Sequence, residues 1–191
     1  MFKSICRLAV VFAFSITQAY ACNLVDKRVC EIGAKLEAET GHKVQYVADF
    51  SARIAAVEWA IGQPDIVHLG DTLTLGDEEL FFVLAHEFGH SVMRHGRKFV
   101  ESFGPESAKS DSDIELLKKY GAAAREGTGS QELNHSHEYD ADTFAAKLMA
   151  KYGMDYAKAM KGFLKPDPSS VTHPSRRQRI EHAKKAVAEQ A

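Results

Sequence analysis

The stretch EELFFVLAHEFGHSVMRH, residues 78–95, decides the fold of this chain. The segment from Leu80 to Ala85 is apolar on nearly every side of a helix, so it predicts a buried central helix rather than a surface one. Asp77 can cap the start of this helix, and Gly96 can occupy the position after its end. We therefore predict a helix over residues 77–95 around which the rest of the domain packs.

The same helix contains His86-Glu87-Phe88-Gly89-His90, with two histidines four residues apart. Residues at this spacing project from one face of a helix, so both imidazoles can reach a single metal ion. Glu87 is rotated by about 100° from His86, which lets its carboxylate reach a water on that metal rather than bind the metal itself. The alternative is a chance motif with solvated histidines. The apolar helix argues against it, because burying these polar groups without a partner is costly.

A catalytic zinc site needs a third protein ligand and leaves one position open. The candidate ligand is Glu138, in the segment HSHEYDADTFAAKLMA at residues 135–150. Asp142 follows it by one helical turn and can accept the free N–H of a ligating histidine, for which we select His86. On an exposed helix face both carboxylates would simply be solvated. The small and apolar residues that flank them favour a packed helix instead.

Three motifs follow one another along the chain: HEFGH at 86–90, HEYDAD at 137–142 and THPSRRQRI at 172–180. In this combination the sequence resembles the HtpX/BepA-like family of zinc metallopeptidases, which includes the prenyl-protein endopeptidases, over about residues 66–182. The resemblance implies a gluzincin-type endopeptidase with one zinc ion per chain, bound by His86, His90 and Glu138, and with Glu87 as catalytic base. It also implies that His173 and Arg179 approach the site and help to stabilise the reaction intermediate.

One segment departs from the family pattern. The family usually carries an Asn-Ala-Phe-like segment on the strand before the active-site helix, where the substrate backbone pairs. Residues 57–60 of this chain read Val-Glu-Trp-Ala instead. The sequence also lacks the multi-spanning membrane helices of some family members. These differences affect the substrate cleft and membrane association rather than the metal site.

Three further histidines lie near the motifs. His95 follows His90 by five residues, about 140° around a helix, so we expect it to miss the metal and to serve packing or the helix C-terminus. His135 lies about one turn before Glu138 and can approach the metal, whereas His137 should face elsewhere. For His135 and His137 we expect a solvated or supporting role, because a fourth protein ligand would close the site.

The first 21 residues have the pattern of a secretory signal peptide. Two basic residues precede an apolar run from Leu8 to Ile16, and Ala19-Tyr20-Ala21 supplies a cleavage site. The run is shorter than the ~20 residues needed to span a bilayer, and no later segment is long and apolar enough. We expect a signal peptide at 1–21 and a zinc metallopeptidase domain at 22–191, exported to the bacterial periplasm or envelope.

The cysteines leave two interpretations of the segment after the cleavage site. Three cysteines are too few for a fold built on disulfides. Cys22 and Cys30 can form a disulfide in an exported protein if the chain between them folds back. Alternatively, Cys22 carries a lipid anchor, although Ala19 and Tyr20 fit a lipoprotein signal poorly.

Composition and the order of elements narrow the fold. The chain has 191 residues, 45% of them hydrophobic, which suits a single globular domain. Its net charge of −2 gives no electrostatic footprint for nucleic acid.

We expect helices at 26–40, 112–121, 131–151, 155–164 and from Pro174, strands at 42–48, 53–61 and 66–69, and a loop at 99–112. His68, on the last strand, either lines the cleft or makes a cross-strand contact. The predicted fold is α+β: a mostly helical, minimal gluzincin-type domain with a small sheet beside the active-site helix.

The expected function is that of an exported zinc-dependent endopeptidase that hydrolyses peptide bonds in proteins, with a part in protein quality control in the cell envelope. Its partners would be protein or peptide substrates. The alternative is a latent or non-cleaving zinc-containing protein that binds or chaperones clients there. In a latent form, residues 121–134, His135 or His173 would fill the open metal position. The presence of Glu87 favours the enzyme, because a purely structural site needs no base.

Overall fold

The computed structural model of the protein describes residues 26–49, 55–58, 64–96, 98, 131–164 and 168–189. The expected signal peptide, Cys22, the loop at 99–112 and the short helix at 112–121 lie outside these residues. None of the helices in the described segments is both long enough and apolar enough to cross a membrane.

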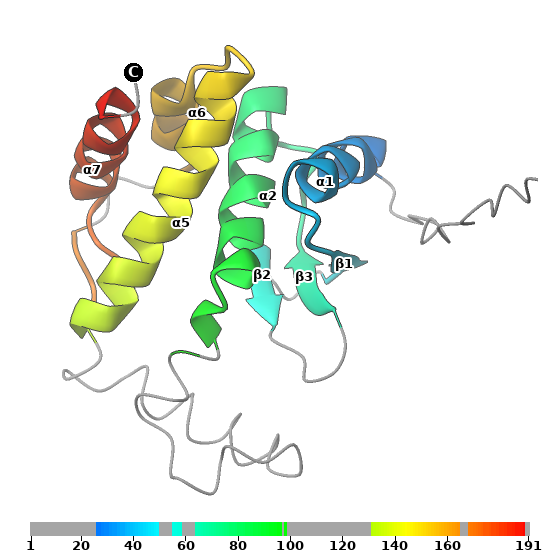
Figure 1. Ribbon diagram of the computed structural model, residues 1–191, viewed down its shortest axis with the longest axis horizontal. Coiled ribbons are helices and arrows are strands. Elements are labelled where there is room, and N and C mark those ends of the chain that lie inside the picture. Colours follow the sequence, from blue (N-terminus) through cyan, green and yellow to red (C-terminus); the bar gives the residue numbers. More distant parts are fainter. Residues whose placement is uncertain are drawn as a thin grey trace, which may run out of the picture.

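Helix α2 (Asp77–Val92) runs between α1 (Lys27–Thr40) and α5 (Gln131–Lys151), as Figure 1 shows. Every side chain from Leu80 to Ala85 is at most 1% exposed, as a run that is apolar on all sides predicts. The expectation that Asp77 caps this helix was wrong. Gly76 is the N-cap, and Asp77 is the first helical residue, with its carboxylate 2.9 Å from the Arg28 guanidinium.

The predicted end of α2 at residue 95 was also wrong. The helix ends at Val92, and Arg94 has a φ of 56°, in the left-handed region that residues other than glycine seldom adopt. The Arg94 N–H donates to the Ser91 carbonyl at 3.0 Å and closes a turn. Because the chain changes direction there, residues after Arg94 do not continue on the path of the helix.

Helix α5 lies beside α2 with small residues at the contact. Ala141 and Ala145 are fully buried, and Gly89 supplies the close approach from α2. A Cβ at position 89 would lie 3.1 Å from the Phe144 ring and 3.3 Å from the Ala141 backbone, so any larger residue would have to push these neighbours away by a few tenths of an ångström. The crossing brings the middle of α2 against the first half of α5.

The sheet has three strands, β1 (Val44–Ala48), β2 (Ala55–Glu58) and β3 (Asp65–Leu69), in the order β1-β3-β2. Strand β3 is central, parallel to β1 and antiparallel to β2. Its Val67 and Leu69 side chains are buried in the core. His68 makes the cross-strand contact that we considered, 3.0 Å from Glu58 and 3.2 Å from Asp49.

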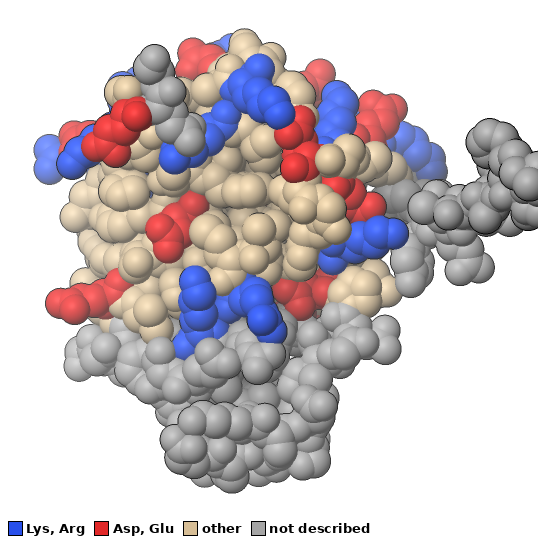
Figure 2. Space-filling model, viewed as in Figure 1, with Lys and Arg blue, Asp and Glu red and all other residues tan. Residues whose placement is uncertain are grey.

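Two further helices, α6 (Tyr156–Phe163) and α7 (Arg176–Ala188), complete the layer that contains α5 (Figure 1). Asp155 and Ser175 cap them, so Pro174 precedes the cap of α7 instead of opening the helix. Basic and acidic side chains are interspersed over the face shown in Figure 2. The mostly helical α+β fold with a small sheet agrees with the prediction.

Cys30, in α1, is disulfide-bonded. The other two cysteines, Cys6 and Cys22, lie outside the described residues. The described residues do not include the partner of Cys30, so both interpretations of Cys22 stay predictions.

Candidate metal centre

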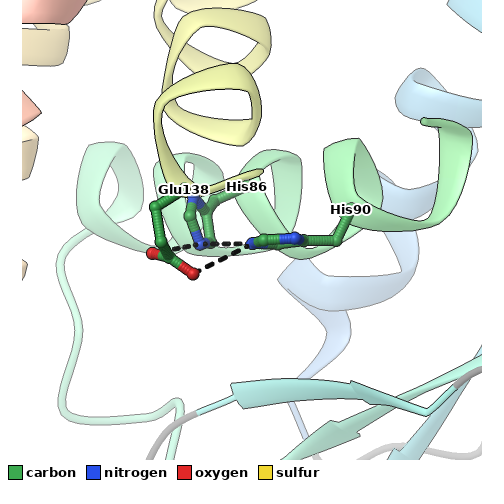
Figure 3. A group of neighbouring side chains, drawn as sticks. All are labelled: His86, His90 and Glu138. Atoms are coloured by element: carbon green, nitrogen blue, oxygen red, sulfur yellow. Dashed lines mark hydrogen bonds and ion pairs between the residues drawn. The ribbon is translucent and has the colours of Figure 1, made fainter. Parts of the chain in front are cut away.

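Three side chains from two helices converge on one point. His86 and His90 project from α2, and Glu138 reaches them from α5 (Figure 3). The two Nε2 atoms are 3.1 Å apart. Glu138 places Oε2 3.6 Å from the Nε2 of His86 and Oε1 3.4 Å from the Nε2 of His90.

These distances fit a tetrahedral metal ion. Zinc bonds of about 2.0–2.1 Å to nitrogen and oxygen require neighbouring ligand atoms to be about 3.3 Å apart. His86 is 6% and Glu138 8% exposed. Within the described part of the chain, Glu138 Oε2 is a buried acceptor that makes an ion pair with Arg179 at 3.0 Å but no hydrogen bond of regular geometry. Two imidazoles and one carboxylate form a common catalytic zinc donor set, and this arrangement leaves a further position for water or substrate.

The predicted contact between Asp142 and His86 is present. Asp142 Oδ1 lies 3.0 Å from the Nδ1 of His86, which is the ring nitrogen directed away from the metal position. A proton on Nδ1 leaves the lone pair on Nε2, as a metal ligand requires. The structure thus brings together the three predicted ligands and the predicted supporting carboxylate, although their roles as ligands stay predictions.

Arg179, from α7, contacts Asp142 and Glu138 and is not among the residues that line the cavity at the metal position. Its guanidinium donates two hydrogen bonds of 2.7 Å to Asp142, and Nη1 lies 3.0 Å from Glu138 Oε2. Arg179 is 5% exposed and Asp142 fully buried. This placement favours a positioning role through the two carboxylates over the direct contact with the reacting atoms that the resemblance implied.

The two buried carboxylates of the centre are held in their charged form by their neighbours. Burial alone would raise the pKa of Asp142 and of Glu138. Arg179 and His86 nevertheless lower the pKa of Asp142, and His90, His86 and Arg179 hold the pKa of Glu138 well below its usual range. The Glu138 and Asp142 carboxylates therefore stay charged at the candidate metal position, where Glu138 can bind a cation and Asp142 can support His86.

His173 approaches the centre from the loop before α7. Its Nε2 lies 3.7 Å from Glu138 Oε1, and its Nδ1 lies 2.8 Å from Thr172 Oγ1. The start of α5 anchors this loop: His135 Nε2 lies 2.6 Å from the Ser170 carbonyl, and the Asn134 amide donates to the Val171 carbonyl at 3.3 Å. His135 is therefore directed to the loop and not to the metal position.

The three candidate ligands and Glu87 line one cavity of about 380 Å³. Ala55, Ala56 and Val57 of the edge strand β2 line another side of it, and His173 lies on its wall. Glu87 is partly exposed to this space. A peptide that entered the cavity would therefore meet the metal position and the Glu87 carboxylate together.

The expectations for His95 and His137 need correction. His95 stays out of the candidate ligand group, as expected, yet its Nδ1 lies 2.9 Å from the Nδ1 of His90. Its ring stacks on that of His137 with centroids 4.1 Å apart, and both side chains are buried. Burial lowers the pKa of His95 to about 2, with further contributions from His90 and His137. The left-handed turn at Arg94 produces this contact, and the helical spacing gave no signal of it.

A second contact that the sequence did not reveal fixes the end of α2 on the sheet. Ser91 follows the ligand candidate His90, is 2% exposed and donates to Asp65 at the start of β3 at 2.5 Å. His42 Nε2 lies 2.8 Å from the same hydroxyl oxygen. These residues are distant in the sequence, so no local pattern predicts their contact.

Comparison with known proteins shows the family of this chain. Residues 24–187 match the sequence profile of Peptidase family M48. Among solved structures, S. mikatae Ste24p is similar, with a TM-score of 0.45 and 18% sequence identity over 80% of this chain and 49% of that one. This chain thus spans about half the length of that protein. No curated protein matches the sequence. Because the profile match covers most of its residues, this chain belongs to peptidase family M48, a family of zinc metalloendopeptidases.

Proposed function

We propose that this chain is an exported zinc endopeptidase whose metal is held by His86, His90 and Glu138 and whose general base is Glu87. The observation that carries the proposal is the convergence of the three donor atoms at the wall of a cavity that Glu87 also lines. A structural zinc site would be closed by a fourth protein ligand, whereas this one borders open space.

Each residue of the centre has a separate role in the proposed reaction. When bound, zinc would acidify a water and polarise the carbonyl of the scissile bond. Glu87 accepts the proton of the attacking water and returns it to the leaving amine. Asp142 keeps the His86 ring in the tautomer that binds metal, and Arg179 holds Asp142 and Glu138 in place.

Strand β2 supports peptide as the substrate class. It is an edge strand of the sheet, and three of its residues line the cavity. An extended peptide can add to such an edge through main-chain hydrogen bonds, which places its backbone beside the metal centre. Folded substrates offer few extended segments, so we further propose a preference for unfolded chains, as quality control of envelope proteins would need. Cleavage of one substrate protein in its folded and unfolded forms tests this preference.

Two observations support export. The first 21 residues have the pattern of a signal peptide, and Cys30 is disulfide-bonded, which suits an oxidising compartment. The intact mass of protein recovered from the envelope fraction tests this proposal. We expect a chain that starts at Cys22 and has lost two hydrogens to a disulfide, whereas an acyl chain on Cys22 would add mass. An uncleaved chain would contradict the proposed export.

Zinc content and casein cleavage together test the enzyme. We expect one zinc per chain by mass spectrometry in the wild type and in Glu87→Gln, with cleavage lost only in the variant. The matched control is Glu181→Gln, which alters a 69% exposed carboxylate on α7 and should cleave normally. An active Glu87→Gln protein would refute the assigned base. Zinc without cleavage by the wild type would favour a latent or binding protein.

The position of His173 favours a latent peptidase as the second candidate function. Its Nε2 lies 3.7 Å from a ligand oxygen and its ring lines the cavity, so a small movement would bring it to the open metal position. The variant His173→Phe separates the two roles. A fall in kcat indicates that His173 assists the reaction, whereas a rise in cleavage indicates that it blocks the metal in a latent form.

A further inference from the structure

The two histidines of the candidate metal site are each supported by a different residue. On His86, the nitrogen directed away from the metal position meets the carboxylate of Asp142. On His90, the equivalent nitrogen meets the imidazole of His95, with the two Nδ1 atoms 2.9 Å apart. His95 is 3% exposed, so water has little access to this contact.

The contact is compatible with one distribution of protons. His90 directs Nε2 at His86 and Glu138, so a metal there takes the Nε2 lone pair and leaves the proton on Nδ1. That N–H can only donate, and His95 Nδ1 must therefore accept with its lone pair. The proton of His95 then lies on Nε2, which is buried without a hydrogen-bond partner among the described residues and has the Asp140 carboxylate 3.8 Å away.

The surrounding structure holds His95 in place for this role. The left-handed turn at Arg94 returns the chain towards His90 after α2 has ended. The His137 ring covers His95 on one face, with an interplanar angle of 9°. Within the described part of the chain, His137 makes no hydrogen bond to either candidate histidine ligand, so its part in the cluster is packing against His95.

We propose that His95 is a positioning residue that fixes the tautomer and ring orientation of His90, as Asp142 does for His86. The proposal rests on the proposed function, since it takes His90 as a metal ligand. It assigns His95 to the zinc site without placing it on the zinc. Loss of such a supporting partner weakens metal binding by about 10–100-fold in proteins.

Two substitutions at position 95 separate hydrogen bonding from packing. His95→Phe keeps a ring to stack on His137 but removes the acceptor. His95→Asn loses the ring but keeps a carbonyl oxygen near the place of Nδ1. The matched control is His137→Phe, which removes an imidazole from the same stack. Zinc affinity is measured by chelator competition on the purified chain, and melting of the metal-free proteins shows whether each variant folds.

We expect His95→Phe to raise the zinc dissociation constant about 10–100-fold, with His95→Asn and His137→Phe within about threefold of wild type, because both keep an acceptor for His90. The visible absorption of the cobalt-substituted protein, which reports ligand geometry, should change in His95→Phe alone. The opposite order, with Asn more harmful than Phe, would assign His95 to packing and overturn the proposal.

A measurement on the wild-type protein tests the proposal even if the position-95 variants do not fold. Long-range proton–nitrogen NMR of the zinc-loaded, 15N-labelled chain should show a proton on His90 Nδ1, a proton on His95 Nε2 and a bare His95 Nδ1. A proton on His95 Nδ1 would overturn the proposal. If the wild type binds zinc and cleaves casein while His95→Phe is unchanged, only this inference fails. If the wild type binds no zinc, the proposed function fails as well.

Discussion

The buried pair of Asp142 and Arg179 gives the sharpest prediction about stability. Two hydrogen bonds of 2.7 Å join the carboxylate to the guanidinium, and neither side chain is more than 5% exposed. The substitution Asp142→Asn has nearly the same shape but removes the charge. It leaves Arg179 as a buried cation that has lost its two charge-assisted hydrogen bonds of 2.7 Å and keeps the ion pair with Glu138 at 3.0 Å.

The expected loss is large because the remaining charge cannot reach water. Removing one partner of a buried ion pair costs about 3–5 kcal/mol, whereas an exposed pair contributes about 0–1 kcal/mol. For a chain of this size that loss lowers the melting temperature by roughly 6–20 °C. Asp142→Asn should also weaken zinc binding by about 10–100-fold, because a neutral amide holds the His86 N–H less well.

Thermal and urea unfolding of the metal-free proteins measure the loss, and a double-mutant cycle with Arg179→Met isolates the pair. Removing both charges takes away the buried cation together with one carboxylate and leaves Glu138 beside His86 and His90. The double variant should therefore be more stable than the sum of the two single losses predicts, by about 1–3 kcal/mol. Losses below about 1 kcal/mol for both single variants, with no coupling, would refute the buried-pair reasoning.

Two further predictions concern the helices that carry the site. Arg28 lowers the pKa of Asp26, chiefly through a side-chain hydrogen bond. The charged Asp26 carboxylate therefore stabilises the fold at pH values above its unfolded pKa of about 3.9. This stabilisation is lost as the pH falls through the lower pKa of the folded state. Asp26→Asn, which can still cap α1, should therefore cost about 1–2 kcal/mol at pH 7 in urea unfolding, and the loss should shrink as the pH falls through the lowered folded pKa of Asp26. A loss that does not change with pH in the acidic range would contradict the ionic contribution. Gly89→Ala should cost about 1–3 kcal/mol and weaken zinc binding, because its Cβ meets Phe144 and Ala141 across the α2–α5 contact. Normal stability and zinc affinity in Gly89→Ala would show that α2 and α5 can shift enough to accommodate the methyl group without loss, and would contradict the prediction.

The sequence predicts those parts of the site that depend on helical spacing. His86 and His90 are four residues apart on one helix, and Glu138 and Asp142 repeat that spacing on another. In each case one helical face directs both side chains to the same place. The run from Leu80 to Ala85 likewise predicted a helix buried on all sides, and it is buried throughout.

The parts that could not be predicted depend on backbone geometry or on long-range contacts. Arg94 has no sequence signal for a left-handed conformation, which glycine and asparagine usually supply, so α2 was extended too far and His95 was directed away from His90. Asp77 is a common capping residue type, yet its pairing with Arg28 in α1 leaves Gly76 as the cap. Arg179 was predicted to approach the site, and it does, but no local pattern predicted its contact with Asp142, which arises only when α7 packs on α5.

Anomalous X-ray diffraction from zinc-loaded crystals at the zinc edge tests the central claim most directly. We predict one peak per chain, bonded to the Nε2 atoms of His86 and His90 and to a carboxylate oxygen of Glu138 at about 2.0–2.2 Å, with a position open to the cavity. The same peak should persist in Glu87→Gln. A peak at other residues, or none at these three side chains, would contradict the assigned metal centre and the mechanism built on it.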